Sequence, residues 1–116
     1  MFVGFTPAIS PSAAKRVRAE VRRWRLHCRT PASVQELAQW SNPVIRGWLN
    51  YYGAYNRSAL IPLARHIDWH LLKWVKTKYR KRGRSWRRAR RWLGQVAHHQ
   101  PVLFAHWRLA APFPAE

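Results

Sequence analysis

Basic and aromatic side chains are concentrated between residues 73 and 91 of this sequence. The stretch holds eleven Lys or Arg residues and no acid, and tryptophans and a tyrosine alternate with the cations. A phosphate backbone needs several cations within reach, and unpaired bases need flat rings or guanidinium planes on which to stack. Most charge runs are solvated helix faces, but such a face normally carries compensating acids. The pattern therefore indicates a surface that contacts nucleic acid.

The aromatic rings divide into two groups by their place in the expected helices. Trp24, Trp48 and Trp74 fall on apolar stripes, so we expect them in the core. Five other rings fit the stripes less well and are candidates for stacking on bases: Trp40, Tyr51, Tyr55, Trp69 and Trp86. With the cations, this gives a predicted RNA-binding set of Arg46, Tyr51, Lys73, Lys76, Arg80, Lys81, Arg84, Trp86, Arg87, Arg88 and Arg91.

Catalytic and metal-binding patterns are weak by comparison. His66 and His70 have the four-residue spacing of a metal-binding pair on a helix, but no third ligand can be assigned and Asp68 is expected on another face. A structural or RNA-facing role is favoured for both. The sequence shows neither a nucleophile motif nor a phosphate-binding glycine loop. We expect no enzymatic activity from this chain alone, no metal and no cofactor.

Composition narrows the class of partner. In 116 residues, 22 Lys and Arg face four acids, a net charge of +18 that a compact body tolerates when a polyanion neutralises it. The 17 arginines outnumber the five lysines, which favours phosphates and bases over lipid headgroups. A single cysteine excludes an internal disulfide, and neither a spanning segment nor a signal peptide is recognisable. By elimination we expect an intracellular protein.

Capping signals predict helices in the first half. Ser10-Pro11 begins the first helix, whose apolar stripe extends to Trp24 and Cys28. A capping box at residues 33–36 begins a short second helix. Asn42-Pro43 repeats the cap-plus-proline signal and predicts the start of a third helix, with Val44 on its apolar face and Gly47 at a close helix contact.

The second half predicts two more helices and a docked tail. The longest helix is expected from Ser58 to about Lys81, with Pro62 in its first turn. Ser85 can cap a fifth helix that ends at His99. Phe104 and Trp107 are expected to dock on the bundle. The expected organisation is an extended segment at 1–9, a helical domain at 10–110 and a frayed tail at 111–116.

Several separated segments resemble the maturase-specific domain of group II intron reverse transcriptases. The most recognisable one joins Asn42-Pro43, Arg46-Gly47-Trp48 and Asn50-Tyr51-Tyr52. Further resemblance lies, in the family's order, at residues 2–5, 33–37, 72–79 and 101–107. The resemblance implies an all-α, thumb-like helical bundle of about four to five helices with a short extended N-terminal segment. Residues 1–9 would then be the remnant of a palm-end strand.

The resemblance also implies a function and a partner. The chain would bind group II intron RNA and stabilise its folded form for splicing, in the bacterial cytoplasm. The segments carry no polymerase palm, so polymerase activity is not expected of this chain. Three alternatives stay open: the thumb subunit of a split reverse transcriptase, docking on a separate palm chain; a decayed, non-functional fragment; and a basic protein of the membrane surface, which the prolines and the arginine excess disfavour. A homodimer that covers the N-terminal segment is a further partner that the sequence leaves open.

Overall fold

The described part of the chain is built from helices only. The computed structural model describes residues 10–52, 60–79 and 85–109, and these ranges contain four α-helices, two short 3₁₀ turns and no strand. The elements are α1 (Pro11–Arg23), η1 (Leu26–Cys28), α2 (Val34–Tyr52), α3 (Ile61–Lys78), α4 (Trp86–His99) and η3 (Ala105–Arg108). The predicted all-α class is confirmed. The expected extended segment and the frayed tail lie outside the described residues.

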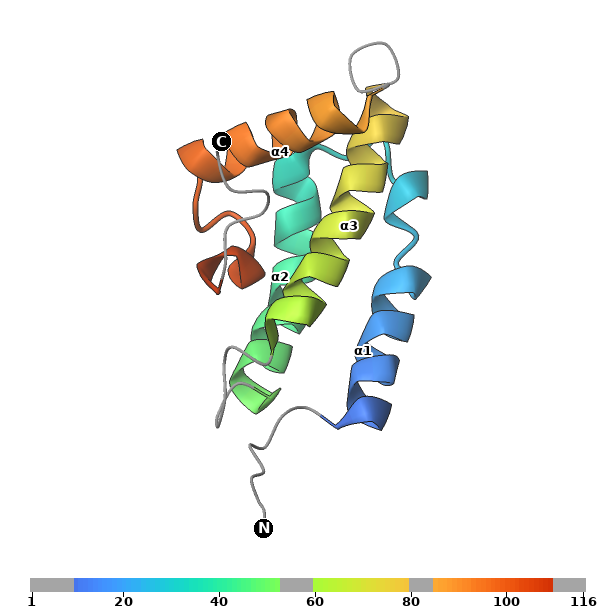
Figure 1. The fold of residues 1–116 in the computed structure, drawn as a ribbon, viewed down its shortest axis with the longest axis vertical. Coiled ribbons are helices and arrows are strands. Elements are labelled where there is room, and N and C mark those ends of the chain that lie inside the picture. The colour runs from blue at the N-terminus through green and yellow to red at the C-terminus, as the bar shows by residue number, and fades with distance from the viewer. Residues whose placement is uncertain (1–9, 53–59, 80–84, 110–116) are drawn as a thin grey trace.

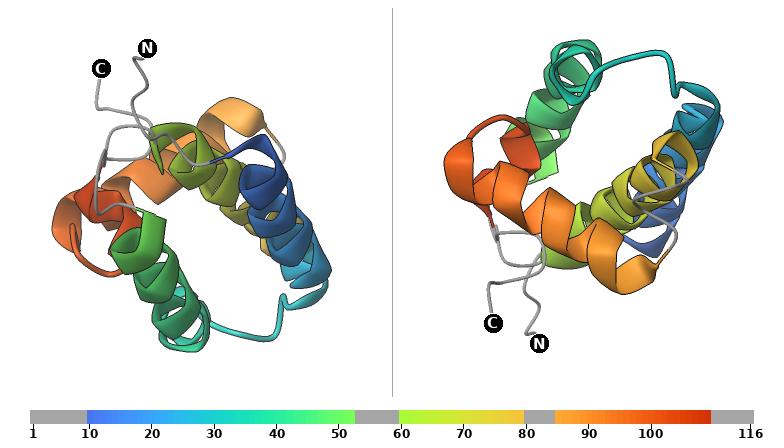
Figure 2. Two further views of the ribbon diagram at one scale, coloured as in Figure 1. Left: turned by 90° about the horizontal axis from the view of Figure 1, so that it is seen from below. Right: turned by 90° about the horizontal axis from the view of Figure 1, so that it is seen from above.

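Helix α3 is the central element of the bundle. It runs between α1 and α2, and α4 crosses one end of the bundle (Figure 1). Contacts join α3 to α1, η1 and α4, while α2 packs on η3. Viewed along the long axis, the elements surround one interior (Figure 2). Trp74 of α3 fills that interior, fully buried among Leu72, Leu93 and Phe104.

The connection between α1 and α2 is tied to the end of α3. The Trp74 indole Nε1 donates to the Arg29 carbonyl at 3.0 Å. The Lys78 ammonium donates to the carbonyls of Thr30 and Ala32 at 2.5 and 2.7 Å. These bonds satisfy carbonyls of an irregular segment that would otherwise lack partners. Lys78 therefore has a structural role.

Three helix starts follow their local capping signals. The Ser10 hydroxyl accepts from the Ala13 N–H, and the Ser85 hydroxyl accepts from the Arg87 N–H. The capping box is complete: the Ser33 N–H donates to the Glu36 carboxylate at 2.8 Å, and the Glu36 N–H donates to the Ser33 hydroxyl at 3.1 Å. These expectations are confirmed because each depends on atoms within three residues of one another.

The first helix ends earlier than its apolar stripe predicts. Helix α1 stops at Arg23, and Arg25 takes a left-handed conformation with φ of 50°. An arginine in that region costs about 1–2 kcal/mol. The turn directs Leu26 into the core at 2% exposure and leaves Cys28 on the surface. The assignment of Cys28 to the buried stripe was therefore wrong.

Helix α2 runs through the predicted break at Asn42-Pro43. The expected second and third helices are one element, with Pro43 exposed inside it. Asn42 does not cap a helix. Its amide donates to the Leu103 carbonyl at 2.8 Å and accepts from the Ala105 N–H at 2.9 Å. Tertiary packing thus overrides the local signal, since Leu37, Ala38 and Ile45 form one buried face across the proline.

Two further expectations for α2 were wrong. Gly47 does not sit at a close helix contact, because a Cβ built there would meet no atom within 4 Å. Val44 is 42% exposed rather than part of the apolar face. Both residues lie on the outward side of α2. The helix continues through Pro43, and its periodicity places them opposite the buried face.

The segment after α4 is held by a buried polar network. The Asp68 Oδ1 atom lies 2.7 Å from His106 Nε2 and accepts from Trp107 Nε1 at 2.8 Å. Asp68 and His106 are 4% and 1% exposed, and Phe104 and Trp107 are also buried. The expected docking of Phe104 and Trp107 is confirmed. Asp68 and Asn42 together fix this tail segment (residues 103–108) to α3 and α2.

Pro43→Ala is expected to stabilise the protein by about 1–3 kcal/mol. The substitution restores an N–H inside α2 and removes the clash of the proline ring with the preceding turn. Urea denaturation measures the change in unfolding free energy. Pro62→Ala is the matched control, since Pro62 lies in the first turn of α3, where proline is tolerated. Destabilisation by Pro43→Ala would contradict this account of α2.

Asp68→Ala is expected to cost about 2–4 kcal/mol of stability. It leaves the His106 and Trp107 ring nitrogens buried without their acceptor. Thermal and urea unfolding measure the loss. Glu20→Ala removes the same charge from an exposed ion pair with Arg23 and should change stability by less than about 1 kcal/mol. Equal effects of the two variants would show that charge, and not the buried network, is responsible.

Candidate nucleic-acid interface

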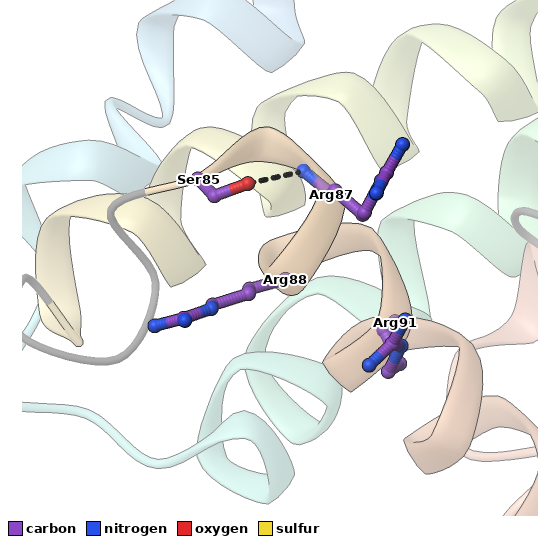
Figure 3. Close-up of a pocket in the computed structure, with 4 residues that line it drawn as sticks. All are labelled: Ser85, Arg87, Arg88 and Arg91. Atoms are coloured by element: carbon purple, nitrogen blue, oxygen red, sulfur yellow. Dashed lines mark hydrogen bonds between the residues drawn. The ribbon is translucent and has the colours of Figure 1, made fainter.

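The outward side of α4 carries the densest group of described cations. Arg87, Arg88 and Arg91 are exposed and, with Ser85, line an open hollow of about 580 Å³. Their side chains leave the helix in different directions (Figure 3). Spread guanidinium groups of this kind can contact successive phosphates of a polynucleotide backbone, whereas a convergent cluster would enclose one small anion.

The sequence of α4 explains why these arginines face outward. Ala89, Leu93 and Ala97 are buried at three- and four-residue spacing and hold one side of the helix against the core. Arg87, Arg88 and Arg91 follow the same periodicity on the opposite side. The Ser85 cap fixes the first turn, so the positive end of the helix dipole adds to the guanidinium charges.

A second group of predicted residues meets where α3 and α4 cross. The rings of Trp69 and Trp86 are stacked, with centroids 5.0 Å apart and planes 17° from parallel. We refer to Trp69 and Trp86 as the tryptophan pair. Lys76 Nζ lies 3.9 Å from the centroid of the Trp86 ring, and Lys73 Nζ lies 5.4 Å from that of Trp69. Lys73, Lys76 and Trp86 are thus brought together.

Trp69 is missing from the predicted binding set, although it was a stacking candidate. The signal that could have placed it there is the spacing of Trp69, Lys73 and Lys76, which share one face of α3 at intervals of four and three residues. The other partner of the pair, Trp86, is supplied by a different helix. Its contact with Trp69 is a product of the α3–α4 crossing that local sequence does not reveal.

The remaining predicted residues lie apart from these two groups. Arg46 and Tyr51 are exposed on α2, and Tyr51, 76% exposed, is next to the last residue of that helix. That end of α2 is far from α4 (Figure 1). Arg80, Lys81 and Arg84 lie outside the described residues, as does Tyr55. The structure therefore joins six of the eleven residues around the α4 end of the bundle.

The other exposed tryptophan, Trp40, belongs to a separate aromatic group. Its ring meets Trp24 edge-on at 5.4 Å, and Trp24 stacks on Trp48 at 5.5 Å. The Arg29 guanidinium lies 4.2 Å from the centroid of the Trp40 ring. Burial of Trp24 and Trp74 confirms their predicted core positions, while Trp48 is half-buried. The Trp40 ring already has a cation of its own chain over it.

The three described acids are engaged away from the α4 cations. Glu20 pairs with Arg23 at 2.8 Å, and Asp68 is buried under the tail segment. Glu36 completes the capping box, and the hydrogen bonds from Ser33 lower the pKa of its carboxyl group. None of these bonds reaches the tryptophan pair or the hollow on α4. The positive potential of that surface is therefore available to an external polyanion.

His66 and His70 lie together but are not part of a larger ligand group. Their ring centroids are 4.7 Å apart, and no group of three or more metal-binding side chains gathers among the residues that the structure describes. Burial, with further contributions from His66, Lys73 and Arg22, lowers the pKa of His70 from 6.5 to about 4. Burial also lowers the pKa of His66. Both imidazoles are therefore neutral near pH 7.

Comparison with known protein families identifies one domain in this chain. A model described as the group II intron maturase-specific domain matches residues 14–92 of the chain. The chain belongs to this family. Only the maturase-specific domain is found in the chain. Searches of curated proteins and of solved structures returned no match.

The matched range, residues 14–92, includes most of the described helices. It contains most of α1, all of α2 and α3, the tryptophan pair and the arginines of the hollow. It ends within α4, so the tail segment lies beyond it. The family identity implies a role in binding group II intron RNA. Within the described ranges, no helix is long and apolar enough to cross a membrane.

His70→Gln is expected to make the stability of the maturase-specific domain less sensitive to acid. The native state keeps His70 neutral, whereas the unfolded chain binds a proton as the pH falls below 6.5, so stability is lost between pH 6.5 and about 4. One pKa unit corresponds to about 1.4 kcal/mol, and we expect the variant to lose about 1–2 kcal/mol less over this interval. Urea titrations at several pH values measure the difference. A slope equal to wild type in His70→Gln would contradict the assignment.

Proposed function

We propose that this domain binds folded group II intron RNA through its phosphate backbone and stabilises the form of the RNA that splices. The observation that carries the proposal is the arginine-lined hollow on α4, which lies inside the range matched to the maturase-specific domain. Arg46 and Tyr51 on α2, and Arg80, Lys81 and Arg84, are proposed as further contacts beyond the α4 end.

The charges of the domain support RNA as the partner. Arginine forms paired hydrogen bonds with phosphate oxygens, and three arginines of the hollow point in different directions (Figure 3). The described acids are bonded elsewhere, so a polyanion meets little repulsion at this surface. Binding would release counterions from the RNA and relieve the self-repulsion of a chain with a net charge of +18.

The helical surface favours recognition of RNA shape over sequence. A-form RNA presents phosphates and 2′-hydroxyls across a wide minor groove, while its deep major groove does not admit side chains. Exposed arginines on a rigid helix suit the first of these surfaces. We further propose that the chain has no polymerase activity of its own and that primer extension by it alone will not be detected.

The joint substitution Arg87→Glu and Arg88→Glu tests the proposal. We expect affinity for a folded group II intron RNA to fall at least tenfold and the slope of log affinity against log salt to lose about 2. Filter binding at several salt concentrations, with duplex DNA as competitor, measures both. Glutamates in the first turn of α4 suit the helix dipole, so the fold should be preserved.

The control variant changes the same charge at another surface. Lys15→Glu with Arg16→Glu places two exposed acids on α1, away from α4. If both double variants weaken binding equally, net charge alone explains the affinity and the site on α4 is wrong. If wild-type binding disappears when duplex DNA is added, the domain is a non-specific polyanion binder and the proposed function fails.

A further inference from the structure

The tryptophan pair is exposed in spite of its stacking. Trp69 and Trp86 remain 42% and 40% exposed, although each ring covers one face of the other. Burying these rings fully would stabilise the fold, since large aromatic side chains contribute strongly to hydrophobic burial. A contact that served only to join α3 and α4 would not need to leave so much of both rings in water.

The two rings differ in what lies over them. Lys76 Nζ is 3.9 Å from the centroid of the Trp86 ring, too close for another ring to fit between the ammonium group and Trp86. The Trp69 ring stacks on the same indole, so Trp86 is contacted both by an ammonium group and by a second ring. Lys73 Nζ also lies over the Trp69 ring, but at the longer distance of 5.4 Å from its centroid. Of the two rings, Trp69 has the more distant ammonium group and keeps 42% of its surface exposed, so its outer face, the one turned away from Trp86, offers more room to a further planar group.

The surroundings of Trp69 are basic. Arg65 is exposed one turn before Trp69 on α3, and Lys73 follows one turn after it. Any of the four nucleobases can stack on a flat ring, and cations on both sides of the ring can bind the phosphates that flank the base. Lys76 adds a further positive charge beside the tryptophan pair, held there by the attraction of its ammonium group to the π face of the Trp86 indole ring.

From these contacts we infer that the outer face of Trp69 is a stacking site for an unpaired nucleobase of RNA, with Lys73 and Arg65 on the flanking phosphates. The inference rests on the proposed RNA-binding function and adds a ligand class to it. The arginines of the α4 hollow contact paired RNA through phosphates, while the tryptophan pair holds a single-stranded nucleotide next to it.

An abasic probe tests the inference on the unaltered protein. The probe is an RNA hairpin with a single-stranded tail of about ten nucleotides, compared with the same hairpin whose tail keeps its phosphates but lacks bases. The two RNAs carry the same charge, so phosphate contacts are equal. We expect the tail with bases to bind about tenfold more tightly. Equal affinities would overturn the inference.

Variants then assign the effect to Trp69. Trp69→Ala should lose about tenfold on the tail with bases and nothing on the abasic tail, while Trp69→Phe keeps a ring and most of the affinity. Trp40→Ala is the matched control, because Trp40 is 44% exposed but lies under Arg29. A loss with Trp69→Ala on both tails alike would assign Trp69 a structural role and overturn the stacking site.

The outcomes separate this inference from the function on which it rests. If neither hairpin binds, RNA binding itself fails, and the stacking site fails with it. If both bind equally and depend on Arg87 and Arg88, the phosphate surface stands and the stacking site is wrong. Should Trp69→Ala not fold, the comparison of the two tails on the unaltered protein still tests the stacking site, and equal affinities overturn it.

Discussion

The packing of the tail segment on the bundle depends on the hydrogen bonds that the Asp68 carboxylate accepts from that segment. A buried carboxylate is costly unless hydrogen bonds and opposite charge compensate for lost water. Here two ring nitrogens of the tail segment reach one of its oxygens, and the surrounding chain carries a large excess of positive charge. The bonds draw Phe104 and Trp107 onto the core between α2 and α3. One acid thus organises the contact of the tail segment with α3.

The exposed residues of α3 and α4 are not needed to close the core and can bind a partner. Trp69, Lys73 and Lys76 share one face of α3 by their spacing, and the arginines of α4 lie opposite its buried alanines. Such a surface repels itself, so a bound polyanion would stabilise the native state through mass action. Binding and folding are therefore linked in this domain, because the same positive charges favour binding of a polyanion and destabilise the fold by repelling one another.

Sequence reasoning succeeded where the cause is local. The caps at Ser10, Ser33 and Ser85 depend on atoms within a turn, and α4 ends at His99 as expected. It failed where distant segments meet. Asn42 resembles a cap until Leu103 and Ala105 are placed beside it, and the tryptophan pair exists because two helices cross. The placement of Arg46 and Tyr51 away from α4 likewise follows from packing that no local pattern encodes.

The tail segment also bears on where this domain ends as a physical unit. The family match stops at residue 92, yet residues 103–108 supply a phenylalanine, a histidine and a tryptophan to the same interior as α2 and α3. A fragment cut at the matched boundary would expose the Asp68 carboxylate and a large apolar surface to water. The range of the family match is therefore shorter than the body that packs around Asp68.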